Sequence, residues 1–409
     1  MTSSSVLLAS FQRPVSKKRL SLFLRCAAIS FLPAAIYFTG VMRKDTDQFH
    51  RPSLKQVVST DSHDRENAAW DTTRPTCNLN AENKSATATV ECFKPGTVPG
   101  LGTKMCSCRD GWHGVDCAVP SAVWSTPTFR RWYSEGLIKR RTRPRAVFNG
   151  ITLNHELDLL EMHVEELSDV VDRYVVVEAN RTFFGAPKPL HLQPKLKVGG
   201  FAHGHSHKIV PLTLGTLECQ GCDPFWPESR SRNVTWQEGQ RWLGNVSDDD
   251  LFLLTDVDEL PNPDVLLFLK YHDGYGEPIG LMLRWFLYGF FWEHRRATRI
   301  YAVCTVAFMR TVYADNVQML RDGRRTTAEA MPAGTGTRAH PWVIEGTRPR
   351  FAGWHCSWCF DAKGIQNKLV SSQRDDGVRW GDMAQNTDLA YIESLRREGT
   401  VLRRTAVDC

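Results

Sequence analysis

The chain has 409 residues, 12 cysteines and a formal net charge of +6. The charge does not indicate a nucleic acid partner, because much of it lies near the N-terminus and in Lys139–Arg145, a run typical of a solvated linker. Twelve cysteines would be unusual in a cytosolic enzyme and are ordinary in a lumenal or secreted one.

A membrane anchor is predicted at residues 20–42, which are apolar apart from Arg25 and a few small polar residues. Four basic residues precede it, so the positive-inside rule places residues 1–19 in the cytoplasm. A cleaved signal peptide would need a shorter apolar core and a small-residue cleavage site. We therefore expect a type II single-pass protein whose remaining chain lies outside the cytosol.

N-glycosylation triplets agree with this orientation, since all follow the predicted anchor. They begin at Asn83, Asn180, Asn233 and Asn245. Together with the cysteines, they predict the secretory pathway.

Three segments separate the anchor from the main domain. Residues 43–76 are polar and without periodicity, as in a flexible stem. Residues 77–117 carry five cysteines, and their second half resembles an EGF-like domain, which implies that Cys108 pairs with Cys117. Five cysteines instead of six favour a disulfide-stapled spacer without a ligand. Residues 118–144 are expected to be a linker, whose basic run also resembles a dibasic processing site.

Residues 145–409 are long enough to form one domain with its own core. Arg145–Ile151 and Tyr174–Val177 are predicted as strands, and Leu157–Leu167 between them has the apolar spacing of a helix. Strand, helix and strand in this order predict a right-handed crossover in a parallel sheet.

The remaining predicted elements continue an α/β pattern with a mostly parallel central sheet. The predicted strands are Leu251–Leu254, Gly280–Trp292 and Ile300–Val312, and the predicted helices are Gln237–Leu243, a segment starting near Asp264, Ile365–Ser371 and Thr387–Arg397.

Asp256 and Asp258 directly follow the predicted strand Leu251–Leu254, in the segment LLTDVDE. Ligands of open parallel sheets bind beyond the carboxyl ends of the strands. There, two carboxylates can hold a divalent cation, which can in turn hold a diphosphate; oxygen ligands favour Mn²⁺ or Mg²⁺. The alternative is an acidic turn that ends the strand and caps the next helix. The first interpretation matches a nucleotide-sugar transferase of the GT-A type.

Several segments resemble glycosyltransferase family 17, the β-1,4-mannosyl-glycoprotein 4-β-N-acetylglucosaminyltransferases. They are ELDLLEMHVEEL, VVVEANRTFFGAPKPL, LLTDVDELP, LRWFLYGFFWE and FAGWHCSWCF, in order between about Phe148 and Tyr391. The resemblance implies a GT-A-like fold, UDP-GlcNAc as donor, a divalent cation as cofactor, N-glycans on glycoproteins as acceptors, and the Golgi membrane as location.

The resemblance also suggests roles for particular residues. Asp256 and Asp258 match the family's acidic D-x-D positions and would hold the cation and the diphosphate, with Glu259 orienting them. His355 would supply a nitrogen ligand or contact the diphosphate; alternatively, it is a hydrogen-bonded histidine in an aromatic cluster. Glu178, at a strand end, would line the donor pocket.

An inverting transfer needs a general base, usually a carboxylate. The candidates after the D-x-D segment are Asp361, Asp375, Asp376 and Asp382. We predict Asp382 as the base because RWGD resembles the family; the alternative is an aspartate of a turn or helix start. Asn180 also follows a strand, but its triplet favours glycosylation over donor binding.

Three further patterns have alternative interpretations. The C-x-x-C pairs Cys219–Cys222 and Cys356–Cys359 could form a zinc site, but an oxidising lumen favours disulfides. The alternating histidines of His203–His207 are expected in an exposed loop, as an adventitious metal-binding tract. In the aromatic run Trp285–Trp292, burial is expected for most residues, and Trp285 and Trp292 are the candidates for sugar stacking.

The leading prediction is a metal-dependent, inverting Golgi enzyme that transfers GlcNAc in β-1,4 linkage to the core β-mannose of N-glycans. A related transferase with another donor or acceptor is the first alternative, and an inactive, membrane-tethered glycan-binding protein is the second. The chain ends at Cys409, earlier than the family's chains usually do. In a truncated or alternatively spliced product, impaired acceptor recognition or folding would be expected.

Overall fold

The computed structural model describes residues 91–99, 105–215, 217, 219, 221–323, 340–375 and 378–402. The predicted cytoplasmic segment, anchor and stem, together with Asn83, lie outside the described residues. Within those ranges, no helix combines the length and apolar character needed to cross a membrane.

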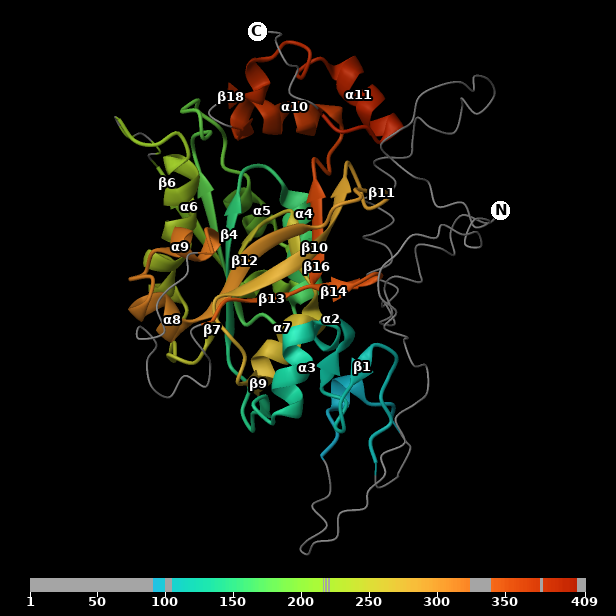
Figure 1. Cartoon of the computed structure of the whole chain (residues 1–409). Coiled ribbons are helices and arrows are strands. Elements are labelled where there is room, and N and C mark those ends of the chain that lie inside the picture. The colour runs from blue at the N-terminus through green and yellow to red at the C-terminus, as the bar shows by residue number, and fades with distance from the viewer. Residues whose placement is uncertain are drawn as a thin grey trace, which may run out of the picture.

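A ten-stranded sheet forms the centre of the molecule, in the order β6-β5-β4-β7-β12-β10-β16-β8, with β11 and β13 also paired to β10 (Figure 1). Its strands are β4 (Val147–Leu153), β5 (Arg173–Ala179), β6 (Ile209–Leu214), β7 (Leu251–Asp256), β8 (Glu259–Pro261), β10 (Ile279–Leu287), β11 (Trp292–Glu293), β12 (Thr298–Thr305), β13 (Trp342–Ile344) and β16 (Gly353–Ser357).

Helices cover both faces of this sheet, and two further helices lie beyond its upper end (Figure 1). They are α2 (Ser121–Trp124), α3 (Pro127–Ser134), α4 (Leu157–Leu167), α5 (Leu192–Val198), α6 (Trp226–Gln237), α7 (Pro263–Tyr271), α8 (Val306–Thr311), α9 (Val317–Arg321), α10 (Ala362–Ser371) and α11 (Leu389–Glu398), with the 3₁₀ segments η3 (Lys94–Gly96), η4 (Phe201–Lys208), η5 (Gly239–Trp242) and η7 (Trp380–Asp382).

The parallel half of the sheet agrees with the sequence prediction. The strands β6, β5, β4 and β7 are parallel neighbours, and α4 connects β4 to β5 over the predicted residues. In β7, Leu251 and Leu253 pack into the core cluster on one face, whereas Phe252 and Leu254 pack into the cluster on the other. Burial on both faces explains the continuous apolar run of this strand.

The other half is mixed, so the prediction of a mostly parallel sheet was correct for only part of it. The strand β12 is antiparallel to both β7 and β10, and β8 is antiparallel to β16. The chain passes from β10 to β12 through β11 without a helix, a connection that permits antiparallel pairing.

Three element predictions were wrong in extent. The strand predicted for Gly280–Trp292 ends at Leu287, and β11 begins only at Trp292. The strand predicted for Ile300–Val312 ends at Thr305, whose side chain accepts a hydrogen bond from Phe308 N and caps α8. The helix predicted for Gln237–Leu243 is a 3₁₀ turn after α6, which ends at Gln237. Gly239 there packs so closely on Val175 that a Cβ atom would lie 2.6 Å from its Cγ1.

The segment before the main domain packs against it, at the end opposite α10 and α11 (Figure 1). Disulfides join Cys92 to Cys106 and Cys108 to Cys117, the second being the pair implied by the EGF-like resemblance. The short strands of this region and the remaining hairpins are β1 (Trp112–His113), β2 (Val119–Pro120), β3 (Lys139–Arg140), β9 (His272–Asp273), β14 (Gly346–Thr347), β15 (Arg350–Phe351), β17 (Arg374–Asp375) and β18 (Val378–Arg379).

The basic run Lys139–Arg145 is not a solvated linker throughout. Arg145 is only 2% exposed, and its guanidinium donates to His272 O and Tyr275 Oη and pairs with Asp273. Arg141 also pairs with Asp273. A buried guanidinium is tolerated here because carbonyl and carboxylate oxygens satisfy its donors.

Candidate functional site

A cavity of about 550 Å³ opens at the carboxyl end of β7. The turn after β4, the β7–β8 segment, β16 and α10 contribute to its lining. Its charged residues are Glu156, Glu228, Asp256, Asp258, Glu259, Arg321, His355, Lys368 and Arg374. The predicted position of a ligand site beyond the strand ends therefore corresponds to a real cavity.

Asp256 is the last residue of β7 and lies between two arginines. Its Oδ2 atom is 2.7 Å from Arg232 Nη2 and 3.2 Å from Arg321 Nη2. Burial alone would raise the pKa of Asp256, but the two guanidinium groups outweigh burial and hold that pKa well below its ordinary value. Thr152 Oγ1, at the end of the neighbouring β4, donates to Asp256 Oδ1 at 3.3 Å. Asp256 is therefore a firmly ionised carboxylate.

Asp258 has a different cationic partner. Lys368 Nζ of α10 lies 2.7 Å from Asp258 Oδ2 and 3.6 Å from Glu156 Oε1. Burial opposes ionisation of Asp258, but Lys368 and then His355 outweigh it and lower its pKa. Burial would likewise lower the pKa of Lys368, whereas Asp258 and Glu156 raise it above its ordinary value. This pair is therefore charged on both sides.

Glu259 is almost completely buried and organises the turn. Its Oε2 atom accepts a hydrogen bond from Asp256 N at 2.9 Å and another from Arg321 Nη1 at 2.8 Å. The carboxylate thus links the backbone of Asp256 to the arginine that also pairs with the Asp256 side chain. This geometry suits the orienting role that the sequence suggests.

His355 lies on β16, opposite Glu259 in the strand register. Its Nε2 atom is 3.0 Å from Ser357 Oγ and 3.9 Å from Asp258 Oδ2. Its Nδ1 atom is buried and has no hydrogen-bond partner in the described part of the chain. The ring is also 6.4 Å from that of Trp285. The ring thus meets the geometry of both predictions, since it lies close to the Asp258 carboxylate and is also hydrogen-bonded to Ser357 and adjacent to Trp285.

The carboxylate oxygens of this donor set suit Mn²⁺ or Mg²⁺, and its one imidazole favours Mn²⁺ of the two. The set is not preassembled, however. Among the described residues, the only group of three or more such ligands within 4.8 Å of one another lies elsewhere, at Glu161, Glu165 and His203. In the cavity, the carboxylates form ion pairs with basic side chains instead.

Two predicted site residues do not line the cavity. Glu178 is 2% exposed, and its carboxylate accepts hydrogen bonds from His191 N and Leu192 N at 2.6 and 3.0 Å. It therefore anchors the start of α5 and does not line the donor pocket as predicted. Asp382 is exposed at the end of η7. Neighbouring Trp380 does line the cavity.

The sequence did not reveal the basic half of the site. Arg232, Arg321 and Lys368 come from α6, α9 and α10. Apart from Glu228, four residues before Arg232, their carboxylate partners lie 24 to 212 residues away along the chain. No local pattern signals such pairs. Lys368 lies within the predicted helix Ile365–Ser371, but nothing in the spacing distinguishes it from a solvated lysine.

Aromatic residues complete the cavity. They are Phe183, Phe225, Trp285, Trp358 and Trp380. Trp285, a predicted candidate, also donates from Nε1 to Ser357 Oγ at 2.9 Å. Trp292 does not line the cavity and instead donates to Arg396 O, which attaches β11 to α11.

Both C-x-x-C pairs form disulfides within themselves, Cys219 with Cys222 and Cys356 with Cys359, so the preference for disulfides over zinc is confirmed. The second bridge encloses Ser357 and Trp358, which line the cavity. It therefore fixes a loop of the site.

Two of the predicted glycosylation residues, Asn180 and Asn245, are exposed. Asn233 is half-buried on α6, and its Oδ1 atom accepts a hydrogen bond from Gln318 N at 3.3 Å. Asn180 and Asn245 thus have the accessibility that attachment of a glycan requires.

An α/β domain with a mixed sheet and an acidic strand end at a cavity is the arrangement that the sequence prediction of a nucleotide-sugar transferase requires. The sequence model described as Glycosyltransferase family 17 matches residues 134–319. This part of the chain is similar to that family.

Three curated relatives carry the name β-1,4-mannosyl-glycoprotein 4-β-N-acetylglucosaminyltransferase. The rat protein is 39% identical over 73% of this chain and 56% of its own length. The human protein is 40% identical over 72% and 55%, and the mouse protein 39% identical over 72% and 54%. The chain thus spans about half the length of these relatives.

A solved structure of the mannosyltransferase PcManGT from Pyrobaculum calidifontis, in complex with GDP-Man and Mn²⁺, is also similar over a small region. Its identity is 15% and its TM-score 0.21, over 36% of this chain and 39% of that one. An overlap of this size supports no argument about the site.

Proposed function

We propose that this protein transfers GlcNAc from UDP-GlcNAc, with inversion, in β-1,4 linkage to the core β-mannose of N-glycans. The relatives named above support this reaction. The observation that carries the proposal is the cavity in which Asp256 and Asp258 are firmly ionised beside Arg321 and Lys368. Such a site provides both anionic ligands for a cation and cationic donors for a diphosphate.

Asp256, Asp258 and His355 would hold Mn²⁺ or Mg²⁺, which supplies neutralising charge to the departing diphosphate when bound. Arg321 and Lys368 keep the two carboxylates ionised and close to the cavity surface. Both side chains line the cavity, so they can also donate to phosphate oxygens of the donor.

We propose two candidates for the base that deprotonates the acceptor hydroxyl. Asp382 follows from the family resemblance. Glu228 follows from the structure, because it lines the cavity and its side chain is 30% exposed, beside Arg232. The substitutions Asp382→Asn and Glu228→Gln distinguish them, since loss of the true base should lower turnover by about 100-fold or more while the protein stays folded.

We place the enzyme in the Golgi membrane, with the described domain in the lumen and glycoproteins as partners. Apart from buried Cys304, the cysteines in the described ranges form disulfides, as in an oxidising compartment. Immunofluorescence together with glycosidase sensitivity of the full-length protein tests this location.

A donor screen tests the reaction. The full-length protein in detergent is incubated with UDP-sugars and an N-glycan acceptor, with Mn²⁺ or EDTA, and UDP release is measured. Release from UDP-GlcNAc alone, with a β-1,4 product on the core mannose, supports the proposal. Release with another donor or acceptor favours a related transferase, and glycan binding without UDP release favours the inactive binding protein.

A further inference from the structure

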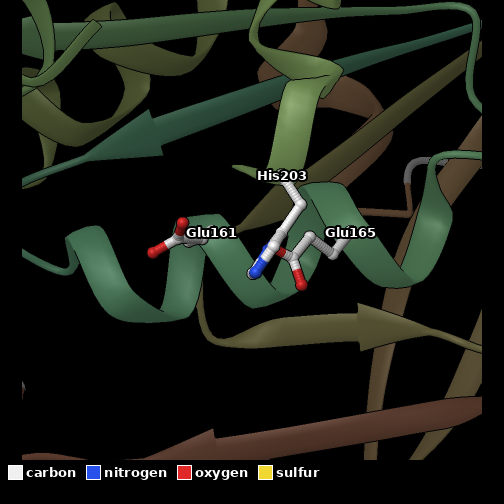
Figure 2. A group of neighbouring side chains, drawn as sticks. All are labelled: Glu161, Glu165 and His203. Carbon is white, nitrogen blue, oxygen red and sulfur yellow. The ribbon is translucent and has the colours of Figure 1, made fainter. Parts of the chain in front are cut away.

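A second group of potential metal ligands lies on α4, outside the cavity. Glu161 and Glu165 are one helical turn apart, and His203 of η4 faces them, as Figure 2 shows. One ligand atom from each residue lies within 4.8 Å of the others. None of Glu161, Glu165 and His203 lines the cavity. The group is therefore separate from the donor site.

The two carboxylates have little balancing charge. The Glu165 side chain is only 10% exposed, and no lysine or arginine of the described ranges forms an ion pair with Glu161 or Glu165. The His203 imidazole pairs with Glu165, but it balances at most one negative charge and only while protonated. A half-buried carboxylate pair without a cation is unfavourable.

The backbone turns the histidine toward the helix. Gly199, Gly200, Ala202, His203 and Gly204 all have positive φ angles. In this conformation Ala202 N donates to Glu161 Oε1 at 3.0 Å. For Ala202 and His203, the left-handed conformation costs about 1–2 kcal/mol each. The contacts between η4 and α4 must offset that cost.

We propose that Glu161, Glu165 and His203 bind one divalent transition-metal ion, of the Zn²⁺ class, that fastens η4 to α4. Two carboxylate oxygens and one imidazole nitrogen form a ligand set that Zn²⁺ accepts, with water in the fourth position. The nitrogen ligand disfavours Ca²⁺ and Mg²⁺. The ion stabilises the fold and takes no part in glycosyl transfer, so this proposal does not depend on the proposed function.

The experiment titrates the EDTA-treated full-length protein with Zn²⁺, by calorimetry and by thermal unfolding. His203→Ala and Glu161→Gln should weaken Zn²⁺ binding on the order of 100-fold, since each ligand carries a share of the binding free energy. Both should also abolish the rise in Tm that Zn²⁺ causes in the unmodified protein. Glu161 is half-buried, so its variant should fold even where a Glu165 variant does not.

The double variant His205→Ala/His207→Ala is the matched control, because both histidines belong to the same tract and lie outside the ligand group. It should keep the Zn²⁺-induced rise in Tm, as should Asp258→Asn in the cavity. The proposal is overturned if His203→Ala and Glu161→Gln bind Zn²⁺ like the unmodified protein. It is equally overturned if the protein shows no Zn²⁺ binding, if only the control loses binding, or if Mg²⁺ or Ca²⁺ stabilises the protein and Zn²⁺ does not.

Discussion

The cavity at the end of β7 and the ligand group on α4 both contain closely spaced carboxylates, but their counter-charges differ. In the cavity, Asp256 pairs with two arginines and Asp258 with Lys368. On α4, the described contacts of Glu161 and Glu165 include no lysine or arginine. A metal ion that binds a carboxylate already paired with a lysine or arginine must displace that side chain, at a cost in free energy. A carboxylate without a cationic partner gains free energy when a suitable cation binds.

The difference implies two modes of metal binding. In the cavity, a cation competes with Arg321 and Lys368 unless a diphosphate arrives to occupy those side chains. We therefore expect cation binding there to be weak without nucleotide and strong with UDP. The group on α4 has no such competitor, so its affinity should not depend on UDP.

Removing a cavity carboxylate should have the largest effect. Asp258→Asn should lower UDP release from UDP-GlcNAc by about 100- to 1,000-fold, the range found when one preorganised electrostatic group is removed from a site. Glu393→Gln, at a half-exposed position of α11 outside the cavity lining, is the control and should retain normal turnover. Normal turnover in a folded Asp258→Asn variant would place the chemistry elsewhere.

Removing the lysine that pairs with Asp258 should chiefly affect the stability of the fold. Lys368→Met leaves Asp258 and Glu156 without their shared counter-charge, so we expect the free energy of unfolding to fall by about 3–5 kcal/mol. Lys363→Met, on the exposed face of the same helix, should change it by less than about 0.5 kcal/mol. Urea unfolding measures both; equal midpoints for the two variants would contradict the pairing.

The pH dependence of stability follows from the same pairs. Asp256 and Asp258 have lowered pKa values in the folded protein, so their stabilising contribution is present above the unfolded value of about 3.9 and is lost as the pH falls through the lower folded values. Lys368 has a raised pKa, so its contribution persists below about pH 10.4 and is lost above it. Burial lowers the pKa of His163 and His272 to about 4, below the unfolded value of about 6.5, so the fold also loses stability through these groups as the pH falls below about 6.5. Urea midpoints should thus form a plateau from about pH 7 to 9, and Asp258→Asn should reduce only the part of the acid decline below about pH 4.

The smallest expected effect concerns the aromatic lining. Trp285→Ala should raise the KM for the N-glycan acceptor by about 2- to 10-fold, consistent with the loss of one stacking contact. Trp242→Ala, which removes a 61% exposed side chain outside the lining, is the matched control. An unchanged acceptor KM in Trp285→Ala would assign this indole to packing alone.

The sequence predicted those features that local patterns determine. The apolar spacing of Leu157–Leu167 defined α4, and the apolar run before Asp256 defined a strand buried on both faces. It failed where distant segments decide the structure. Lys368 meets Asp258 across 110 residues, a contact without a local signal. Thr305, by contrast, caps α8 through Phe308 N three residues further on, a local signal that the apolar run of Ile300–Val312 masked.

The same distinction explains which site residues could be located from the sequence. Asp256 and Asp258 were predictable because their spacing and their position at a strand end are both visible in the chain. Glu178 has the same position at the end of β5, but its carboxylate turns to the backbone of His191 and Leu192. The position of a residue at a strand end is therefore readable from sequence, whereas the direction of its side chain is not.

The central claim is that a cation-dependent transfer of GlcNAc takes place in the cavity of Asp256 and Asp258. It is tested most directly by UDP release from UDP-GlcNAc with an N-glycan acceptor, in Mn²⁺ and in EDTA, followed by linkage analysis of the product. We predict Mn²⁺-dependent release and a β-1,4-linked GlcNAc on the core mannose, both lost in Asp258→Asn. Folded, glycan-binding protein that releases no UDP, or release that is unchanged in Asp258→Asn, would contradict the claim.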